Sequence, residues 1–175
     1  MHLFLTGEVQ VGKSTVIDRA AASLALPAGG FRTGFGPDRA NADRWLCLWD
    51  AGGPAAHDED HGVVRFTARK PEVLPDRFDE LGGGALRRAR ESGAGLILMD
   101  ECGRFEEHAL EFQREIFAAL EGDTPVLGVI RQGFPGWLDR LRAHPKIRLI
   151  TVTEENRDAL PGQIAALLRA ETALY

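Results

Sequence analysis

The amino-acid sequence predicts an α/β fold of three layers, with a mostly parallel central sheet between helices. Short apolar runs alternate along the chain with segments of helical periodicity, as they do in folds of this class. A glycine-rich loop joins the first apolar run to the first helical segment. Between residues 30 and 68, strand-like runs are separated by turn sequences, and these predict an antiparallel hairpin.

The first strand is expected at residues 2–6 and the first helix from Lys13 to about residue 24, where Pro27 and two glycines end it. Short strands are expected at residues 31–33, 44–49 and 62–67. In the second half, continuous apolar runs at 95–99, 125–130 and 147–152 favour parallel strands that are buried on both faces. Helices are expected between them at residues 75–92 (interrupted by Gly82–Gly84), 107–121, 134–143 and 156–173.

The length of 175 residues suits one domain, which we expect to span residues 1–175. No apolar run approaches the roughly 20 residues that span a bilayer, and the formal net charge is −5, so we expect neither a membrane nor a nucleic-acid partner. The two cysteines, Cys47 and Cys102, are too few for a disulfide framework. The first residues lack the pattern of a secretory signal, and a cytoplasmic location is therefore expected.

The loop after the first strand fits the phosphate-binding pattern G-x-x-x-x-G-K-[ST]. It consists of Gly7, Glu8, Val9, Gln10, Val11, Gly12, Lys13, Ser14 and Thr15. In such a loop the backbone N–H groups point into one concavity that fits phosphate oxygens, and the following helix adds its positive end. We expect Lys13 to reach the β- and γ-phosphates of a nucleotide as a catalytic residue, and Ser14 to bind Mg²⁺. Of 21 basic residues only three are lysines, so a lysine at this position is informative.

Two acidic residues follow the apolar run at 95–99. Asp100 is expected to hold Mg²⁺ together with Ser14, because a phosphate-binding loop needs an acidic group at the end of a neighbouring strand. Glu101 is expected to polarise the attacking water as a catalytic base. A solvated loop carboxylate is the alternative for Glu101. The close acidic and histidine residues at 57–61 follow a turn sequence and favour a solvated turn over a metal site.

Four segments together resemble the cancer-related nucleoside-triphosphatase family. They are the phosphate loop, Gly29-Gly30-Phe31, the run Asp-Glu-Cys-Gly-Arg-Phe-Glu at 100–106, and Thr-Glu-Glu-Asn-Arg-Asp at 153–158. The resemblance covers nearly the whole chain. It implies a P-loop NTPase fold of the additional-strand, RecA-like class, and hydrolysis of ATP, GTP and other nucleoside triphosphates with loose selection of the base.

Site residues near the family motifs are implied by this resemblance. The family pattern after the central strand is Asp-Glu-Ile-Gly-Lys-Met-Glu, so Arg104 stands where the family has lysine. The resemblance implies that Arg104 is catalytic and contacts the γ-phosphate, although arginine and lysine differ in geometry; a surface charge is the alternative. Arg32 stands in a tyrosine position and either neutralises phosphate charge or is an ordinary strand residue. Asn156 and Arg157 are implied to bind the nucleotide, but Asn156 could equally cap the last helix.

The leading prediction is a Mg²⁺-dependent hydrolase of nucleoside triphosphates, and two alternatives stay open. One is a small kinase, in which the Arg39–Arg44 segment forms an arginine-rich lid over an acceptor pocket. The other is a nucleotide-operated accessory module, similar to the guanine-dinucleotide cofactor accessory proteins, which binds nucleotide tightly and is accelerated by a protein partner.

Overall fold

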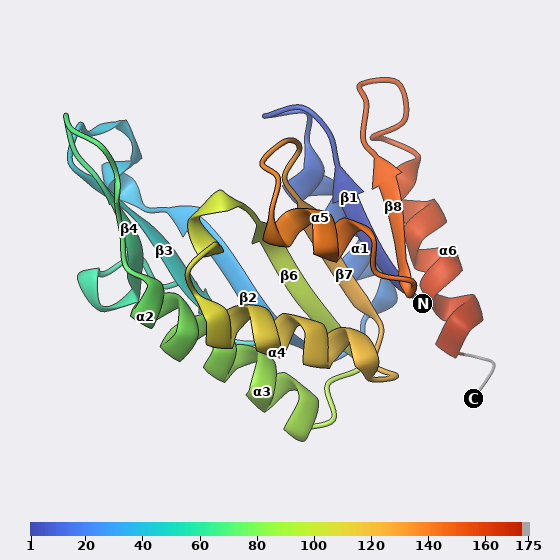
Figure 1. Ribbon diagram of the computed structural model, residues 1–175. Helices are drawn as coiled ribbons and strands as arrows, with labels where there is room; N and C mark the ends of the chain where they lie inside the picture. Colours follow the sequence, from blue (N-terminus) through green and yellow to red (C-terminus); the bar gives the residue numbers. More distant parts are fainter. Residues whose placement is uncertain (173–175) are drawn as a thin grey trace.

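The computed structural model describes residues 1–172 and contains one sheet with the strand order β5-β4-β3-β2-β6-β7-β1-β8 (Figure 1). The strands are β1 (His2–Thr6), β2 (Ala28–Phe35), β3 (Arg44–Asp50), β4 (Gly62–Phe66), β5 (Glu72–Val73), β6 (Leu96–Cys102), β7 (Val126–Ile130) and β8 (Ile147–Thr151). The α-helices are α1 (Lys13–Leu24), α2 (Pro75–Arg77), α3 (Gly84–Glu91), α4 (Leu110–Glu121), α5 (Trp137–Arg142) and α6 (Leu160–Thr172). Short 3₁₀ segments are η1 (Pro37–Ala40), η2 (Glu59–His61) and η4 (Arg104–Glu106), and η3 (Phe78–Gly83) is a π-helix.

The sheet has a parallel part and an antiparallel part, as the sequence predicts. Strands β2, β6, β7, β1 and β8 pair in parallel, whereas β3, β4 and β5 extend the sheet beyond β2 in antiparallel pairs. Strand β7 lies between β1 and β6, which is the added strand that the resemblance implies. The carboxyl ends of the five parallel strands therefore meet at one edge of the sheet, at the top of Figure 1.

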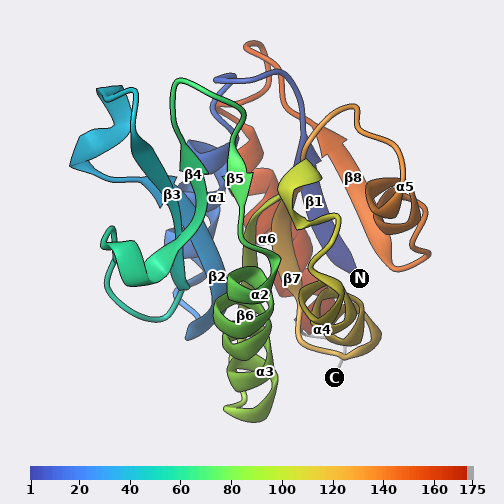
Figure 2. The ribbon, with the colours of Figure 1, turned by 60° about the vertical axis from the view of Figure 1, so that its left-hand side comes forward.

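Helices cover both faces of the sheet and form two separate apolar cores (Figure 2). On one face, Val16 of α1 and Ile164 of α6 pack with Leu3 and Leu5 of β1. On the other face, Phe4 packs in the core that α3, α4 and α5 complete. All five residues of β1 are buried because successive side chains point to opposite, covered faces.

Glycines allow β2 to pack closely on β6 and η3 to pack closely on α4. A Cβ on Gly30, whose φ is +98°, would lie 2.1 Å from the backbone oxygen of Leu98 on the neighbouring strand β6. A Cβ on Gly82 would lie 2.4 Å from the ring of Phe112 in α4. Gly82 and Gly83 therefore face α4 at close range. Elements α2, η3 and α3 follow one another without a gap, although the sequence predicts an interruption at 82–84.

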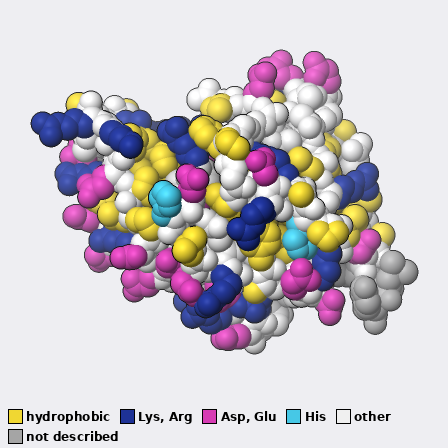
Figure 3. Space-filling view, viewed as in Figure 1, with side chains coloured by type: hydrophobic (Ala, Val, Ile, Leu, Met, Phe, Trp, Pro, Cys, Tyr) yellow, Lys and Arg dark blue, Asp and Glu magenta, His cyan; other side chains and the backbone are white. Residues whose placement is uncertain are grey.

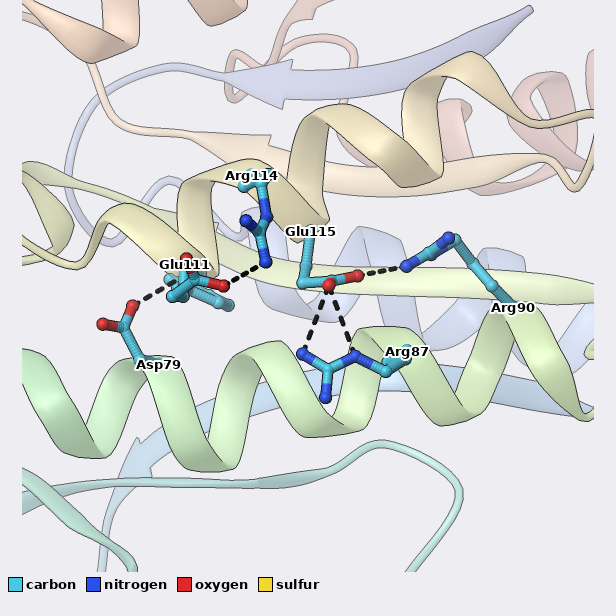
Figure 4. A network of polar contacts seen from close by, with 7 residues as sticks. Asp79, Arg87, Arg90, Glu111, Arg114 and Glu115 are labelled. Carbon is cyan, nitrogen blue, oxygen red and sulfur yellow. Dashed lines mark hydrogen bonds and ion pairs between the residues drawn. The ribbon is translucent and has the colours of Figure 1, made fainter.

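A polar network joins α3 to α4 on the outer side of this core (Figure 4). The carboxylate of Glu115 is almost fully buried and pairs with the guanidinium groups of both Arg87 and Arg90. Asp79 accepts a hydrogen bond of 2.8 Å from the backbone N–H of Phe112 near the start of α4. These contacts hold η3 and α3 against α4, below the edge that forms the site.

Several helices begin later than the periodicity predicts. The last helix begins at Leu160 instead of Asn156, α4 at Leu110 instead of residue 107, and α5 at Trp137 instead of residue 134. Turn residues precede α4 and α6, whereas residues 134–136 before α5 are irregular and end in a bend. The predicted end of the last helix at Ala173 lies outside the described residues. Within residues 1–172, no helix has the length and apolar character needed to traverse a bilayer.

Candidate active site

The loop between β1 and α1 has the backbone conformation of an anion cradle. Gly7, Gln10 and Gly12 have φ angles of +140°, +63° and +110°, so the chain reverses repeatedly over a few residues. A Cβ on Gly7 would lie 2.6 Å from the backbone oxygen of Val152, which excludes any other residue there. Helix α1 begins at Lys13. Its N-cap residue, Gly12, provides no side-chain hydrogen bond, and the first turn of the helix has no acidic residue. Its first N–H groups therefore keep their attraction for an anion.

Lys13 folds back over this loop. Its ammonium group donates a hydrogen bond of 2.9 Å to the backbone oxygen of Gly7 and another to that of Glu8. Partial burial lowers the pKa of Lys13, whereas the nearby carboxylate of Glu101 raises it. The ammonium group thus lies within the concavity, opposite an acidic side chain from β6.

A cavity of about 330 Å³ opens over the loop, and we call it the phosphate cavity. Its lining consists of Gly7, Val9, Gln10, Gly12, Lys13, Ser14, Thr15, Glu101, Arg131 and Gln132. Most of the predicted phosphate-binding residues are therefore brought together. Glu8 and Val11 are the exceptions, because they line a neighbouring cavity toward β8, and Val11 also packs on the apolar core below the loop.

Asp100 and Ser14 face a second cavity of about 480 Å³, which adjoins the phosphate cavity. One carboxylate oxygen of Asp100 accepts a hydrogen bond of 3.1 Å from the backbone N–H of Thr33. Burial raises the pKa of Asp100, and the Thr33 N–H and the Arg32 guanidinium oppose that shift. Arg32 itself forms an ion pair of 2.7 Å with Asp18 of α1. It is therefore engaged with a side chain of the protein rather than directed at the loop.

The oxygen atoms of Ser14 and Asp100 fit a hard cation such as Mg²⁺. This ion prefers a few protein oxygens, and phosphate oxygens and water complete its shell. Among residues 1–172, no three histidine, cysteine or acidic side chains gather as a metal-binding group of their own. In the segment 57–61, His61 pairs with Asp58 and His57 packs against Trp49. Cys102 is fully buried.

Arg131 is a site residue that the sequence analysis missed. It follows β7 directly, and its guanidinium group donates a hydrogen bond of 3.2 Å to the carboxylate of Glu101. Its backbone N–H also donates to the oxygen of Cys102 at 3.0 Å, which fixes the loop against β6. The signal was available as a polar residue immediately after the apolar run at 125–130. Arg131 can be recognised as a site residue only once β7 is known to lie between β1 and β6.

Arg104, which the resemblance implies contacts the γ-phosphate, lies in η4, directly after β6. Its side chain is exposed, and the guanidinium lies over the rings of Phe105 and Phe134, at 4.9 and 5.2 Å from their centroids. It lines the second cavity together with Asp100 and Glu101 but does not line the phosphate cavity.

Asn156 shapes the turn that follows β8. Its side-chain oxygen accepts a hydrogen bond of 2.8 Å from the N–H of Thr153, and its amide group donates to the oxygen of Thr151 at 2.9 Å. The side chain of Arg157 donates to the oxygen of Val11 at 3.3 Å and lies against Gly12. Both residues therefore stabilise the border of a cavity of about 460 Å³, which lies between residues 7–11 and the turn 151–155.

Comparison with known proteins agrees with this geometry. A family model described as NTPase matches residues 2–165. The chain belongs to this NTPase family. Nucleoside-triphosphatase THEP1 of Methanosarcina barkeri is 30% identical over 176 residues, which cover 97% of this chain and 98% of the relative. The THEP1 protein of Thermofilum pendens is 29% identical and covers 94% of this chain and 93% of its own.

Two solved structures have the same fold. THEP1 from Aquifex aeolicus matches with a TM-score of 0.77 at 24% identity, covering 96% of this chain and 99% of its own. A human cancer-related nucleoside triphosphatase matches with a TM-score of 0.75 at 25% identity, covering 97% of each chain. The predicted family and fold are confirmed. As a member of the NTPase family the chain is a hydrolase that acts on nucleoside triphosphates.

Proposed function

We propose that this NTPase requires Mg²⁺ and removes the terminal phosphate of ATP, GTP and other nucleoside triphosphates at the loop 7–15. The single observation that supports this assignment best is the composition of the phosphate cavity. One cavity holds the anion-binding loop, the ammonium group of Lys13 and the carboxylate of Glu101. The loop that would bind the phosphates, the lysine that would stabilise their charge and the glutamate that would act as the base thus line the same cavity.

The loop and α1 would bind the triphosphate through backbone N–H groups, since the positive φ angles of Gly7, Gln10 and Gly12 fold the loop into a concavity and α1 has no side-chain cap. Lys13 would exchange its hydrogen bonds with the oxygens of Gly7 and Glu8 for stronger contacts with the β- and γ-phosphates. Its positive charge then stabilises the charge that develops as the terminal phosphoryl group leaves.

Ser14 and Asp100 would hold Mg²⁺. When bound, the ion neutralises charge on the β- and γ-phosphates and orients them. Asp100 is well placed for this task because the Thr33 N–H occupies one of its oxygens and fixes the carboxylate at the end of β6.

Glu101 would orient the attacking water and accept its proton. The water oxygen then bonds to the γ-phosphorus, and the bond from that phosphorus to the bridging oxygen of the nucleoside diphosphate breaks. The ion pair with Arg131 fixes the carboxylate of Glu101 in position between the two cavities. The products are a nucleoside diphosphate and inorganic phosphate.

The nucleoside would lie toward β8, between residues 7–11 and the turn 151–155. The side chain of Asn156 is held in this turn by one hydrogen bond that it accepts and one that it donates, so it is not free to reorient toward one particular base. This supports the broad base acceptance that the family resemblance implies. Arg157, which lies against Gly12, would stabilise the loop in its binding conformation.

The test of this proposal is Glu101→Gln. The substitution keeps the size of the side chain and removes its basicity. We expect the rate of phosphate release from Mg²⁺-ATP to fall about 10²- to 10⁴-fold, with retained binding of the nucleotide. Glu91→Gln, an exposed change at the end of α3, is the control and should leave the rate unchanged. Tight nucleotide binding without phosphate release by the wild type would instead favour the accessory-module alternative.

A further inference from the structure

The second cavity is lined by aromatic and arginine side chains that hydrolysis by water does not require. It shares Ser14, Glu101 and Arg131 with the phosphate cavity, so the two are continuous at the position of the terminal phosphate. Its volume of about 480 Å³ is in the range of small-molecule sites, which is about 300–1,000 Å³. A water molecule needs only the shared end of this space.

Aromatic rings form the far wall of this cavity. Phe35, Phe66 and Phe105 come from β2, β4 and η4, and all three rings are half-buried. The Phe66 ring lies 5.5 Å from that of Phe35 and 5.8 Å from that of Phe105, edge to face in both pairs. Arg44 stacks on Phe35 and Phe66 and thereby supports this wall. Three elements that are distant in sequence thus present apolar ring surface to the cavity, which suits a planar ligand.

Unpaired guanidinium groups line the same cavity. Arg39, in η1 at the tip of the β2–β3 hairpin, and Arg104 in η4 are both exposed. Neither forms an ion pair with any side chain in the described part of the chain. Figure 3 shows Lys and Arg side chains beside hydrophobic ones on this side of the molecule, at the upper left. Guanidinium groups that no carboxylate neutralises, next to ring surfaces, suit a ligand that carries an anionic group on an aromatic one.

Acidic groups at the other end of the cavity do not oppose an anion strongly. Arg131 pairs with Glu101 at 3.2 Å. Glu106 is fully buried and accepts a hydrogen bond from the N–H of Gly103 at 2.9 Å. Asp100 is assigned above to Mg²⁺. Of the three arginines in the lining, Arg131 is paired with Glu101, and Arg39 and Arg104 have no carboxylate partner among the described residues.

We propose that the second cavity is an acceptor site for a nucleoside monophosphate, which takes the terminal phosphoryl group in place of water. The proposal rests on the proposed function, since the nucleoside triphosphate bound at loop 7–15 is the donor. The base lies on the wall formed by Phe35, Phe66 and Phe105, and the phosphate lies between Arg39, Arg104 and the shared end of the cavity.

The transfer balances without a further reactant. An anionic oxygen of the monophosphate bonds to the γ-phosphorus, and the bond from that phosphorus to the bridging oxygen breaks. The products are two nucleoside diphosphates, and no proton has to be removed from the attacking oxygen. Because the acceptor occupies the position of the attacking water, transfer and hydrolysis compete for the same bound triphosphate.

The experiment uses the full chain, Mg²⁺ and ATP labelled at the γ-phosphate, with AMP, GMP, CMP or UMP added in turn. Label is measured in nucleoside diphosphate and in inorganic phosphate in the same reaction. We expect at least one monophosphate to take up label in a saturable way while labelled inorganic phosphate declines. Arg39→Gln should raise the monophosphate concentration for half-maximal transfer about tenfold or more. Arg148→Gln, on the exposed face of β8, is the matched control and should leave it unchanged.

Phe35→Leu provides a second variant, because it removes the ring and keeps an apolar side chain. It should weaken the acceptor in the same direction as Arg39→Gln. The proposal is overturned if label appears only in inorganic phosphate at all concentrations of the four monophosphates, or if Arg39→Gln and Arg148→Gln behave alike. Failure of the proposed function looks different: without any monophosphate, the wild type would then release no phosphate from ATP.

Discussion

Glu106 provides a quantitative test of how the site is built into the fold. This carboxyl group is fully buried at the end of η4, and its hydrogen bond from Gly103 holds the segment that follows Asp100 and Glu101. Burial raises the pKa of Glu106 to about 7, and the Gly103 N–H and the Arg131 guanidinium oppose that shift. The substitution Glu106→Gln keeps an oxygen acceptor for Gly103 and removes the ionisation.

The sign and size of the effect follow from linkage. Below pH 4.5 the carboxyl group is neutral in both the folded and the unfolded chain, so its contribution to stability is fully present. As the pH rises from 4.5 to about 7, the unfolded state loses its proton first, and the free energy of unfolding of the wild type falls. Above pH 7 the loss is complete and amounts to about 3 kcal/mol relative to the variant.

The assay is urea unfolding of both proteins at pH 5, 6, 7 and 8, followed by tryptophan fluorescence. We expect the difference in the free energy of unfolding to shift in favour of Glu106→Gln by about 2.5 kcal/mol between pH 5 and pH 8, because part of the full loss has already occurred at pH 5. Glu107→Gln, at the exposed neighbouring position, is the control and should show no such trend. A difference between wild type and Glu106→Gln that is constant with pH, or that changes in the opposite direction, would refute the reasoning.

Two further substitutions, each compared with a control substitution, test the packing below the site. Gly30→Ala should lower the free energy of unfolding by at least about 2 kcal/mol, because its φ is +98° and a Cβ would meet the Leu98 oxygen at 2.1 Å. Gly162→Ala in α6, where nothing lies within 4 Å, should instead raise it by about 0.5 kcal/mol, and equal effects in urea unfolding would contradict this account. Glu115→Gln should cost about 2 kcal/mol, because it leaves two guanidinium groups without their buried carboxylate. Glu111→Gln, which breaks the exposed pair with Arg114, should change stability by no more than about 0.5 kcal/mol, and a larger loss there than at Glu115 would disprove the ranking.

Much of the parallel half of the fold is predictable from the sequence because both faces of its strands are covered. The run at residues 2–6 is continuously apolar, and the phosphate-binding pattern places the turn and the start of α1 directly after it. The order of the strands in the sheet is not predictable in the same way, because it depends on contacts between segments that are distant in sequence. Arg131 lies next to Glu101 because β7 pairs with β6 in this order. The local sequence around residue 131 does not reveal which strand β7 pairs with, so the contact could not be predicted from it.

The start of the last helix shows how side-chain hydrogen bonds override periodicity. The helical pattern extends back to Asn156, but this side chain closes a turn with Thr151 and Thr153. The helix therefore begins only at Leu160. Pro161 gave the available signal, since proline is favoured in the first turn of a helix. The aromatic wall of the second cavity was equally hidden, because its three rings come from separate elements.

The central claim is that the loop 7–15 binds a triphosphate and that Lys13 stabilises its transfer. Its most direct test compares phosphate release from Mg²⁺-ATP by the wild type, Lys13→Ala and Lys146→Ala. Lys146 is a matched control, because its ammonium group binds the backbone oxygen of Glu121, outside the cavities of the site. We expect Lys13→Ala to release phosphate about 10²- to 10³-fold more slowly and Lys146→Ala to match the wild type. Equal rates for wild type and Lys13→Ala would contradict the assignment of the site.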